Sequence, residues 1–122
     1  MWSTFDVEGS RVDVHASGPV TFDEVVRNFR WYISQPEFQP DMDVLVDLRE
    51  ATLELTLEQL REVTRTFEHH REQRGQNYKL AIVTSTAVTY GQSRQFDAFS
   101  HSSPVFIGVF EDIEAARKWL GA

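Results

Sequence analysis

Six polar side chains are the best placed to do chemistry, because they follow predicted strands or open a predicted helix: Asp47, Arg49, Thr84, Ser85, Tyr90 and Arg94. In an open α/β sheet, ligands usually bind beyond the carboxyl ends of the strands. Tyr90 and Arg94 lie one helical turn apart and therefore face the same way. The free amides at the start of their helix favour an anion. The pattern predicts a small pocket for an anionic or amphipathic ligand.

A structural role is the alternative for the same residues. Ion pairs and turn residues are common where strands end. On this interpretation, Asp47 pairs with Arg49 or Arg94, and Tyr90 packs beneath a loop. We favour the structural role and keep the pocket as the functional hypothesis.

The sequence contains no pattern typical of a catalytic or metal-binding site. It has no cysteine, which excludes disulfides and zinc sites built on thiolates. His69 and His70 are adjacent, so on a helix their side chains point about 100° apart and cannot chelate one ion. The stretch Gly91-Gln92-Ser93 does not continue as a nucleophile elbow, because Gln95 stands where that motif needs glycine. We therefore expect no enzyme, no metal and no cofactor.

Length and charge indicate one soluble domain over residues 1–122. The 122 residues are close to the commonest length of a single domain. With 19 acidic and 12 basic residues, the net charge is −7, which disfavours nucleic acid or an anionic membrane as the main partner. Residues 1–6 lack the basic and apolar regions of a signal peptide, and the apolar runs are too short to cross a membrane. We expect a cytoplasmic protein without membrane insertion.

Residue spacing predicts five strands and four helices that position these side chains. Apolar runs predict strands over 5–7, 11–16, 44–46, 78–83 and 105–110, with Asp47 at the carboxyl end of the third. Helical spacing predicts helices that begin near residues 22, 57, 87 and 113, two of them behind capping boxes at Thr21 and Thr56. The order ββαβαβαβα indicates an α/β domain with a mostly parallel five-stranded sheet and an antiparallel N-terminal hairpin strand.

Three stretches of the sequence carry a family resemblance: VLVDLR at 44–49, YGQSRQF at 90–96, and VFED at 109–112 leading to AARKWL at 115–120. They resemble the SpoIIAA-like family, which is related to the STAS domains of anti-sigma-factor antagonists. The order of elements is similar over nearly the whole chain. The resemblance implies the α/β fold described above and little agreed function. Relatives in the wider group bind regulatory partner proteins, nucleotides or lipids.

One departure from those relatives concerns phosphorylation. Anti-sigma-factor antagonists carry an Asp-Ser-Ser-Gly-like stretch at the start of the second helix, and a partner kinase phosphorylates its serine. The matching region here is Leu-Thr-Leu-Glu at 55–58, whose one hydroxyl belongs to Thr56. Because threonine is a good helix N-cap, we assign Thr56 to capping rather than to a phospho-switch.

The sequence favours a non-enzymatic regulatory or interaction domain that binds a protein partner through the surface around the second helix. The alternative is a carrier or sensor of a small amphipathic or lipid-like ligand, which requires a cavity between the helices and the sheet. Trp2 and Trp31 lie off the main apolar stripes. They would mark a homodimer or lipid-facing surface, or else pack beneath the hairpin and the loop at 36–40, which we favour.

Overall fold

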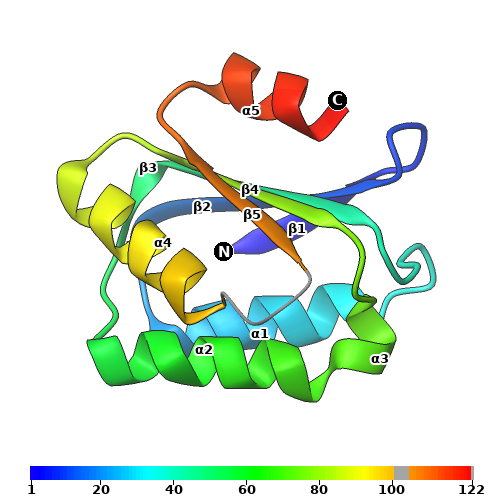
Figure 1. Ribbon diagram of the computed structural model, residues 1–122, viewed down its shortest axis with the longest axis horizontal. Helices are drawn as coiled ribbons and strands as arrows, with labels where there is room; N and C mark the ends of the chain where they lie inside the picture. The colour runs from blue at the N-terminus through cyan, green and yellow to red at the C-terminus, as the bar shows by residue number, and fades with distance from the viewer. Residues whose placement is uncertain (101–104, 122) are drawn as a thin grey trace.

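The computed structural model describes residues 1–100 and 105–121, which form a sheet between two layers of helices (Figure 1). The strands are β1 (Trp2–Asp6), β2 (Arg11–Val20), β3 (Asp43–Leu53), β4 (Lys79–Thr84) and β5 (Phe106–Phe110). The helices are α1 (Phe22–Ile33), α2 (Leu57–His69), α3 (Arg71–Arg74), α4 (Ala87–Phe99) and α5 (Ile113–Gly121).

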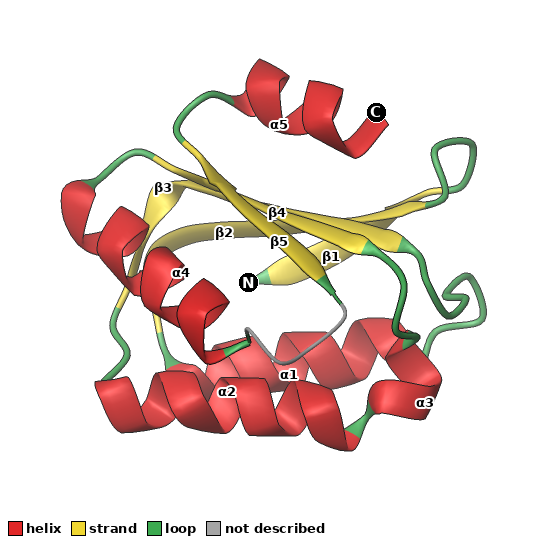
Figure 2. Cartoon of the chain, viewed as in Figure 1, coloured by secondary structure: helices red, strands yellow, loops and turns green. Residues whose placement is uncertain are grey.

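The strands lie side by side in chain order, β1-β2-β3-β4-β5. The first two form an antiparallel hairpin, and the pairs from β2 to β5 are parallel. Helices α1, α2 and α4 cover one face of the sheet, here called the helix side, and α5 covers part of the other face, here called the α5 side (Figure 2). This arrangement confirms the α/β fold predicted from the sequence. The short helix α3, which follows α2, was not predicted.

Three strands are longer than the local sequence pattern predicted. The first begins at Trp2 rather than at residue 5, and β2 continues past residue 16 to Val20. The third runs on from 44–46 to Leu53. The extra length of β2 and β3 comes from their mutual pairing, because after a bulge between His15 and Ser17 the segment 17–20 pairs with 50–53. Local spacing does not reveal a pairing between segments so far apart in the chain.

The three long helices of the helix side begin at threonine N-caps. The hydroxyl oxygens of Thr21, Thr56 and Thr86 each accept a hydrogen bond from the backbone N–H three residues on, at distances of 3.3, 3.1 and 3.2 Å. At Thr56 the Gln59 side chain accepts from the Thr56 backbone N–H at 2.9 Å, which completes the capping box. The capping role predicted for Thr56 is confirmed.

The two sides of the sheet carry separate apolar clusters. On the helix side, the rings of Phe29 and Phe67 lie 4.3 Å apart between centroids, and those of Phe67 and Phe96 lie 5.6 Å apart. The α5 side has a smaller cluster in which Leu45 and Val83 of the sheet meet helix α5. Successive residues of a strand point to opposite faces, so the alternation along β3 and β4 supplies both clusters at once.

A buried arginine joins the end of α2 to the start of β4. Arg74 is 2% exposed, pairs with Glu68 at 2.9 Å, and donates to the carbonyl oxygens of Phe67 and Gly75 at 2.7 and 2.8 Å. Its guanidinium also lies 5.8 Å from the ring centroid of Tyr78. Nothing in the local sequence distinguishes Arg74 from the exposed arginines nearby, so only the tertiary structure reveals its role.

Candidate functional site

Asp47 and Arg49 form an ion pair on the α5 side of the sheet. Arg49 donates from Nη2 to Oδ2 of Asp47 at 2.7 Å, from Nε to Oδ1 at 2.9 Å, and from its backbone N–H to Oδ1 at 3.1 Å. The side-chain hydrogen bond from Arg49 is the main cause that holds the pKa of Asp47 below its ordinary value. Of the two pairings that the sequence left open, the structure has this one.

The position of this pair corrects the sequence analysis. Asp47 lies within β3 rather than at its carboxyl end, because β3 continues to Leu53. Its Cα partner on the neighbouring strand β2 is His15. The pair therefore lies against the open face of the sheet and not at the sheet edge where we expected it.

Ser85 and Thr84, at the end of β4, go to different places. The Ser85 hydroxyl donates to the backbone carbonyl of Arg49 at 2.5 Å, so Ser85 does lie beside the Asp47–Arg49 pair. Thr84 is fully buried, and the alternation along β4 puts it on the helix side with Leu80 and Ile82. Its hydroxyl has no hydrogen-bond partner within residues 1–100 and 105–121.

Tyr90 and Arg94 are carried by α4, which covers the helix side. Tyr90 is half-buried and Arg94 is exposed. The sheet therefore separates both residues from the Asp47–Arg49 pair. Of the six predicted residues, the structure brings together Asp47, Arg49 and Ser85, and it leaves the other three on the opposite side.

A shallow pocket of about 320 Å³ opens on the α5 side, next to the Asp47–Arg49 pair. We call it the Trp2 pocket; it is lined by Trp2, His15, Ala16, Asp47, Arg49 and Glu50. Trp2 is 53% exposed and stacks on the His15 ring, with centroids 5.5 Å apart. Trp31 is 48% exposed, so the expectation that both tryptophans are packed away is wrong. An exposed Trp2 could not be found from the sequence, because strand β1 was predicted to begin after it.

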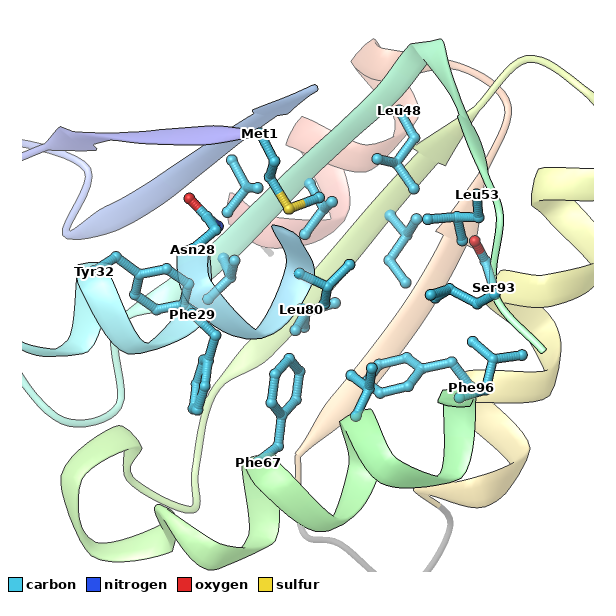
Figure 3. A pocket seen from close by; sticks show the side chains of 18 residues that line it. Met1, Asn28, Phe29, Tyr32, Leu48, Leu53, Phe67, Leu80, Ser93 and Phe96 are labelled. Carbon is cyan, nitrogen blue, oxygen red and sulfur yellow. The ribbon is translucent and has the colours of Figure 1, made fainter. Parts of the chain in front are cut away.

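A second, apolar cavity of about 80 Å³ lies between the sheet and helices α1, α2 and α4. We call it the helix-side cavity. Figure 3 shows Phe67 and Phe96 pointing into it from the helices, opposite Leu48 and Leu80 of the sheet. Val46 also lines it and is only partly buried, although it belongs to the central strand. Native interiors are close-packed, so an apolar opening of this size between the sheet and its helices is a candidate binding site.

Three polar side chains border the helix-side cavity: Asn28, Tyr32 and Ser93. Asn28 accepts a hydrogen bond from Ser3 Oγ at 2.8 Å. Ser93 donates to the backbone carbonyl of Thr89 at 2.8 Å. Burial raises the pKa of Tyr32 well above its ordinary value, so its phenol keeps the proton. The signal in the sequence was the placement of Asn28 and Ser93 on the inner faces of their helices, which the sequence analysis did not use.

The described part of the chain contains no candidate for a metal site or for a membrane-spanning helix. No group of three or more histidine, aspartate or glutamate side chains in residues 1–100 and 105–121 is arranged to hold a metal ion. Over the same residues, no helix combines the length and apolarity needed to span a bilayer.

One solved structure shows the fold. The chain is similar to the crystal structure of an uncharacterised protein of the DUF3478 family from Shewanella loihica PV-4, which has a SpoIIAA-like fold. The two are 19% identical, with a TM-score of 0.59 over 90% of this chain and 83% of the other. The chain therefore has a SpoIIAA-like fold, as its sequence motifs predicted. No family model matches the chain, and no curated protein matches it significantly.

Proposed function

We propose that this domain is a cytoplasmic carrier or sensor of a small amphipathic ligand, which it binds in the helix-side cavity. The observation that carries the proposal is the cavity itself: about 80 Å³ of apolar space between the sheet and three helices. The carrier hypothesis required a cavity in this place. The surface that faces the cavity is almost entirely apolar, which suits the apolar part of such a ligand and leaves its polar end at the opening.

Energetics favour an occupant. The walls of the cavity present apolar side chains with space beside them, and covering such surface with an apolar ligand group removes it from water, which is favourable. An engineered cavity of about 150 Å³ with a similar lining encloses benzene completely, whereas the smaller cavity here opens to the surface, so a single ring can enter it only with part of its surface left outside. A longer molecule must leave part of its length outside the cavity.

The proposal does not include an enzymatic reaction. An enzyme would gain support from Asp47, Tyr90 and Arg94 in one cleft with a carboxylate whose pKa is raised. Instead the sheet separates Asp47 from the other two, and the hydrogen bonds from Arg49 lower the pKa of Asp47. A lowered pKa makes a carboxylate a poorer base.

A second candidate function is the interaction domain favoured by the sequence, binding a protein partner or a second copy of the chain. The expected surface around α2 is mostly charged, although Leu57 at its start is 47% exposed. A better-suited surface is the uncovered sheet face around Trp2, since exposed tryptophan and arginine side chains are typical of binding hot spots. This observation moves the partner hypothesis from α2 to the α5 side.

Native mass spectrometry of the protein as purified is the first test of the carrier function. An added mass that is lost on mild denaturation and identified after extraction would name the ligand class. The same spectrum distinguishes monomer from dimer. Phenol and benzene then serve as defined probes, followed through the methyl signals of isotopically labelled protein.

We expect both probes to shift the methyl signals of Val14, Val46 and Leu48 saturably. The methyl signals of Val83 and Leu120, on the α5 side, should stay unchanged. A clean apo mass together with no saturable shift from either probe would rule out the carrier function and leave the interaction domain.

A further inference from the structure

We propose that the Trp2 pocket binds an organic cation, an ammonium or guanidinium group carried on a short apolar stem. The pocket lies on the α5 side, whereas the helix-side cavity lies across the sheet. The inference therefore does not depend on the ligand proposed for that cavity. An accessible aromatic ring, the charge around it and the size of the pocket support this ligand.

The aromatic wall of the pocket is held in place. Trp2 and His15 are paired across the β1–β2 hairpin, and their rings stack with an interplanar angle of 23°. The hydroxyl of Thr4 lies 3.0 Å from Nε2 of His15 and fixes that ring in turn. One face of the indole is therefore supported by His15, while Trp2 as a whole stays 53% exposed. Among aromatic side chains, tryptophan attracts a cation most strongly.

The charges around the indole favour a cation over an anion. The pocket contains two carboxylates, from Asp47 and Glu50, and one guanidinium, from Arg49. That guanidinium is already bound by Asp47 through two side-chain hydrogen bonds. Glu50 is exposed; it acts on Arg49 electrostatically without forming a salt bridge of its own within residues 1–100 and 105–121. Glu114 of α5 also acts on Arg49, and the whole chain carries a net charge of −7.

The same side of the sheet already contains one interaction of this kind. Nζ of Lys79 lies 5.5 Å from the ring centroid of Trp119, and it donates to the Trp119 backbone carbonyl at 2.9 Å. Trp119 belongs to helix α5, and its ring is partly buried. No Lys or Arg side chain of the described residues lies over Trp2, which α5 does not cover. A cation from outside the chain would form with Trp2 the cation–π contact that Lys79 forms with Trp119.

The size of the pocket limits the ligand to one cationic group with its stem. About 320 Å³ is at the lower end of the range for small-molecule sites. Two sources supply such a group: a free amine or guanidine, and a lysine or arginine side chain of a protein partner. Both present the same chemistry to Trp2 and Glu50, and the experiment below separates them.

The test is a titration of ¹⁵N-labelled protein with butylamine, followed through the indole N–H signals of the three tryptophans. Butyrate and 1-butanol serve as anionic and neutral probes of the same length. We expect butylamine to shift the Trp2 signal saturably, with butyrate and 1-butanol giving no saturable shift. The Trp31 and Trp119 signals should not follow the same curve. Equal shifts from butyrate or 1-butanol, or no saturable shift from butylamine, would overturn the proposal.

Variants locate the site. Trp2→Ala should abolish saturable binding, measured by calorimetry, and Glu50→Gln should weaken it by about three- to fivefold. Trp31→Ala is the matched control, because Trp31 is 48% exposed and lies on helix α1. If Trp31→Ala and Trp2→Ala weaken butylamine binding equally, the Trp2 pocket is not the site.

The last comparison distinguishes the two sources of the cation. The blocked peptide acetyl-Gly-Lys-Gly-amide presents a lysine side chain without a free α-amine. Binding of this peptide at least as tight as that of butylamine supports a side chain of a protein partner. Binding of butylamine alone supports a free amine. If neither binds at low ionic strength, where electrostatic attraction is strongest, the proposal fails.

Discussion

The two faces of the sheet are built from the same strands but differ in how far helices cover them. The helix side is covered by three long helices and an aromatic cluster, and yet it contains an apolar cavity of about 80 Å³. The α5 side has one helix of nine residues, which meets β3, β4 and β5. The rest of that face stays open, with Trp2, His15 and the Asp47–Arg49 pair on its surface.

The difference shows that helices can cover a sheet face without their side chains packing it completely. Alternation along β3 sends Val44, Val46 and Leu48 to the helix side and Leu45 to the α5 side. On the helix side, coverage is broad but packing is incomplete. On the α5 side, packing beneath α5 is tight but coverage is partial. Each side therefore offers a binding site of its own kind, an apolar one beneath the helices and a charged one on the sheet face.

The largest expected effect concerns Arg74, the buried arginine that joins the end of α2 to the start of β4. Arg74→Met should destabilise the fold by about 3 kcal/mol, because it removes a buried ion pair and leaves carbonyl oxygens without donors. Urea unfolding at pH 7 measures the change.

Arg71→Met is the matched control for that variant. Arg71 also pairs with Glu68, at 2.5 Å, but its side chain is 50% exposed. We expect a loss of no more than about 0.5 kcal/mol for it. Similar losses for the two variants would mean that burial of Arg74 does not set its contribution.

The second prediction adds the same methylene group to each side of the sheet. Val46→Ile extends into the helix-side cavity and should stabilise the fold by about 0.5–1 kcal/mol. Val83→Ile adds the group to a fully buried position beneath α5 and should destabilise it by about 1 kcal/mol. Thermal unfolding of both variants tests the comparison, and equal signs would contradict it.

Phenol binding provides a second comparison between the same two variants. Val46→Ile should weaken phenol binding, because the added group occupies space that the probe needs. Val83→Ile should leave the phenol affinity unchanged. The methyl-signal titration described above provides the measurement.

The third prediction concerns the start of α2, one of the three helices on the helix side. Thr56→Ala removes the hydroxyl of the capping box and should cost about 1 kcal/mol. Thr56→Asp keeps a side-chain oxygen that can cap the helix and should recover most of that loss, as measured by urea unfolding. If the alanine variant is as stable as the parent, the capping box is not needed for α2.

The smallest expected effect lies on the open side. The hydrogen bonds from Arg49 lower the pKa of Asp47 in the folded protein, below the value of about 3.9 for an unfolded chain. The pair therefore contributes its stability above about pH 4 and loses it as pH falls through the lowered pKa. Because the pair is partly exposed, we expect Asp47→Asn to cost about 0.5 kcal/mol at pH 7.

The pH profile tests the sign of that effect. The stability difference between the parent and Asp47→Asn should be constant above about pH 5 and shrink below about pH 4. One molar NaCl should reduce it, because salt screens exposed charges. A difference that grows as pH falls would contradict the assignment of Asp47 as the stabilised carboxylate.

Much of the fold was predictable because local rules govern it. The capping pattern at Thr56 and the helical spacing after it fixed the start of α2. Alternating strand and helix signals gave the parallel sheet. The extent of β3 was not predictable, because residues 50–53 find their partners at 17–20 across a bulge. Because the predicted strand was too short, Asp47 was expected at the sheet edge, whereas it lies on the sheet face.

The candidate sites were predictable only in part. The sequence offered the Asp47–Arg49 pair as one of two options, because ion pairs are common where strands end. It also grouped Tyr90 and Arg94 with them, although α4 lies across the sheet. Asn28 was not considered and Ser93 was considered only as a nucleophile, because their place at a cavity depends on the shapes of all its neighbours.

The sequence by itself determined the class of fold, the order of its elements, the helix starts and the absence of cysteine chemistry. These follow from spacing, capping and composition, which act between residues close in the chain. Only the tertiary structure decided how far the strands extend, that Arg74 is buried, and where the helix-side cavity and the Trp2 pocket lie. These depend on how separate elements meet, and the packing of distant side chains against one another is a property that no local pattern records.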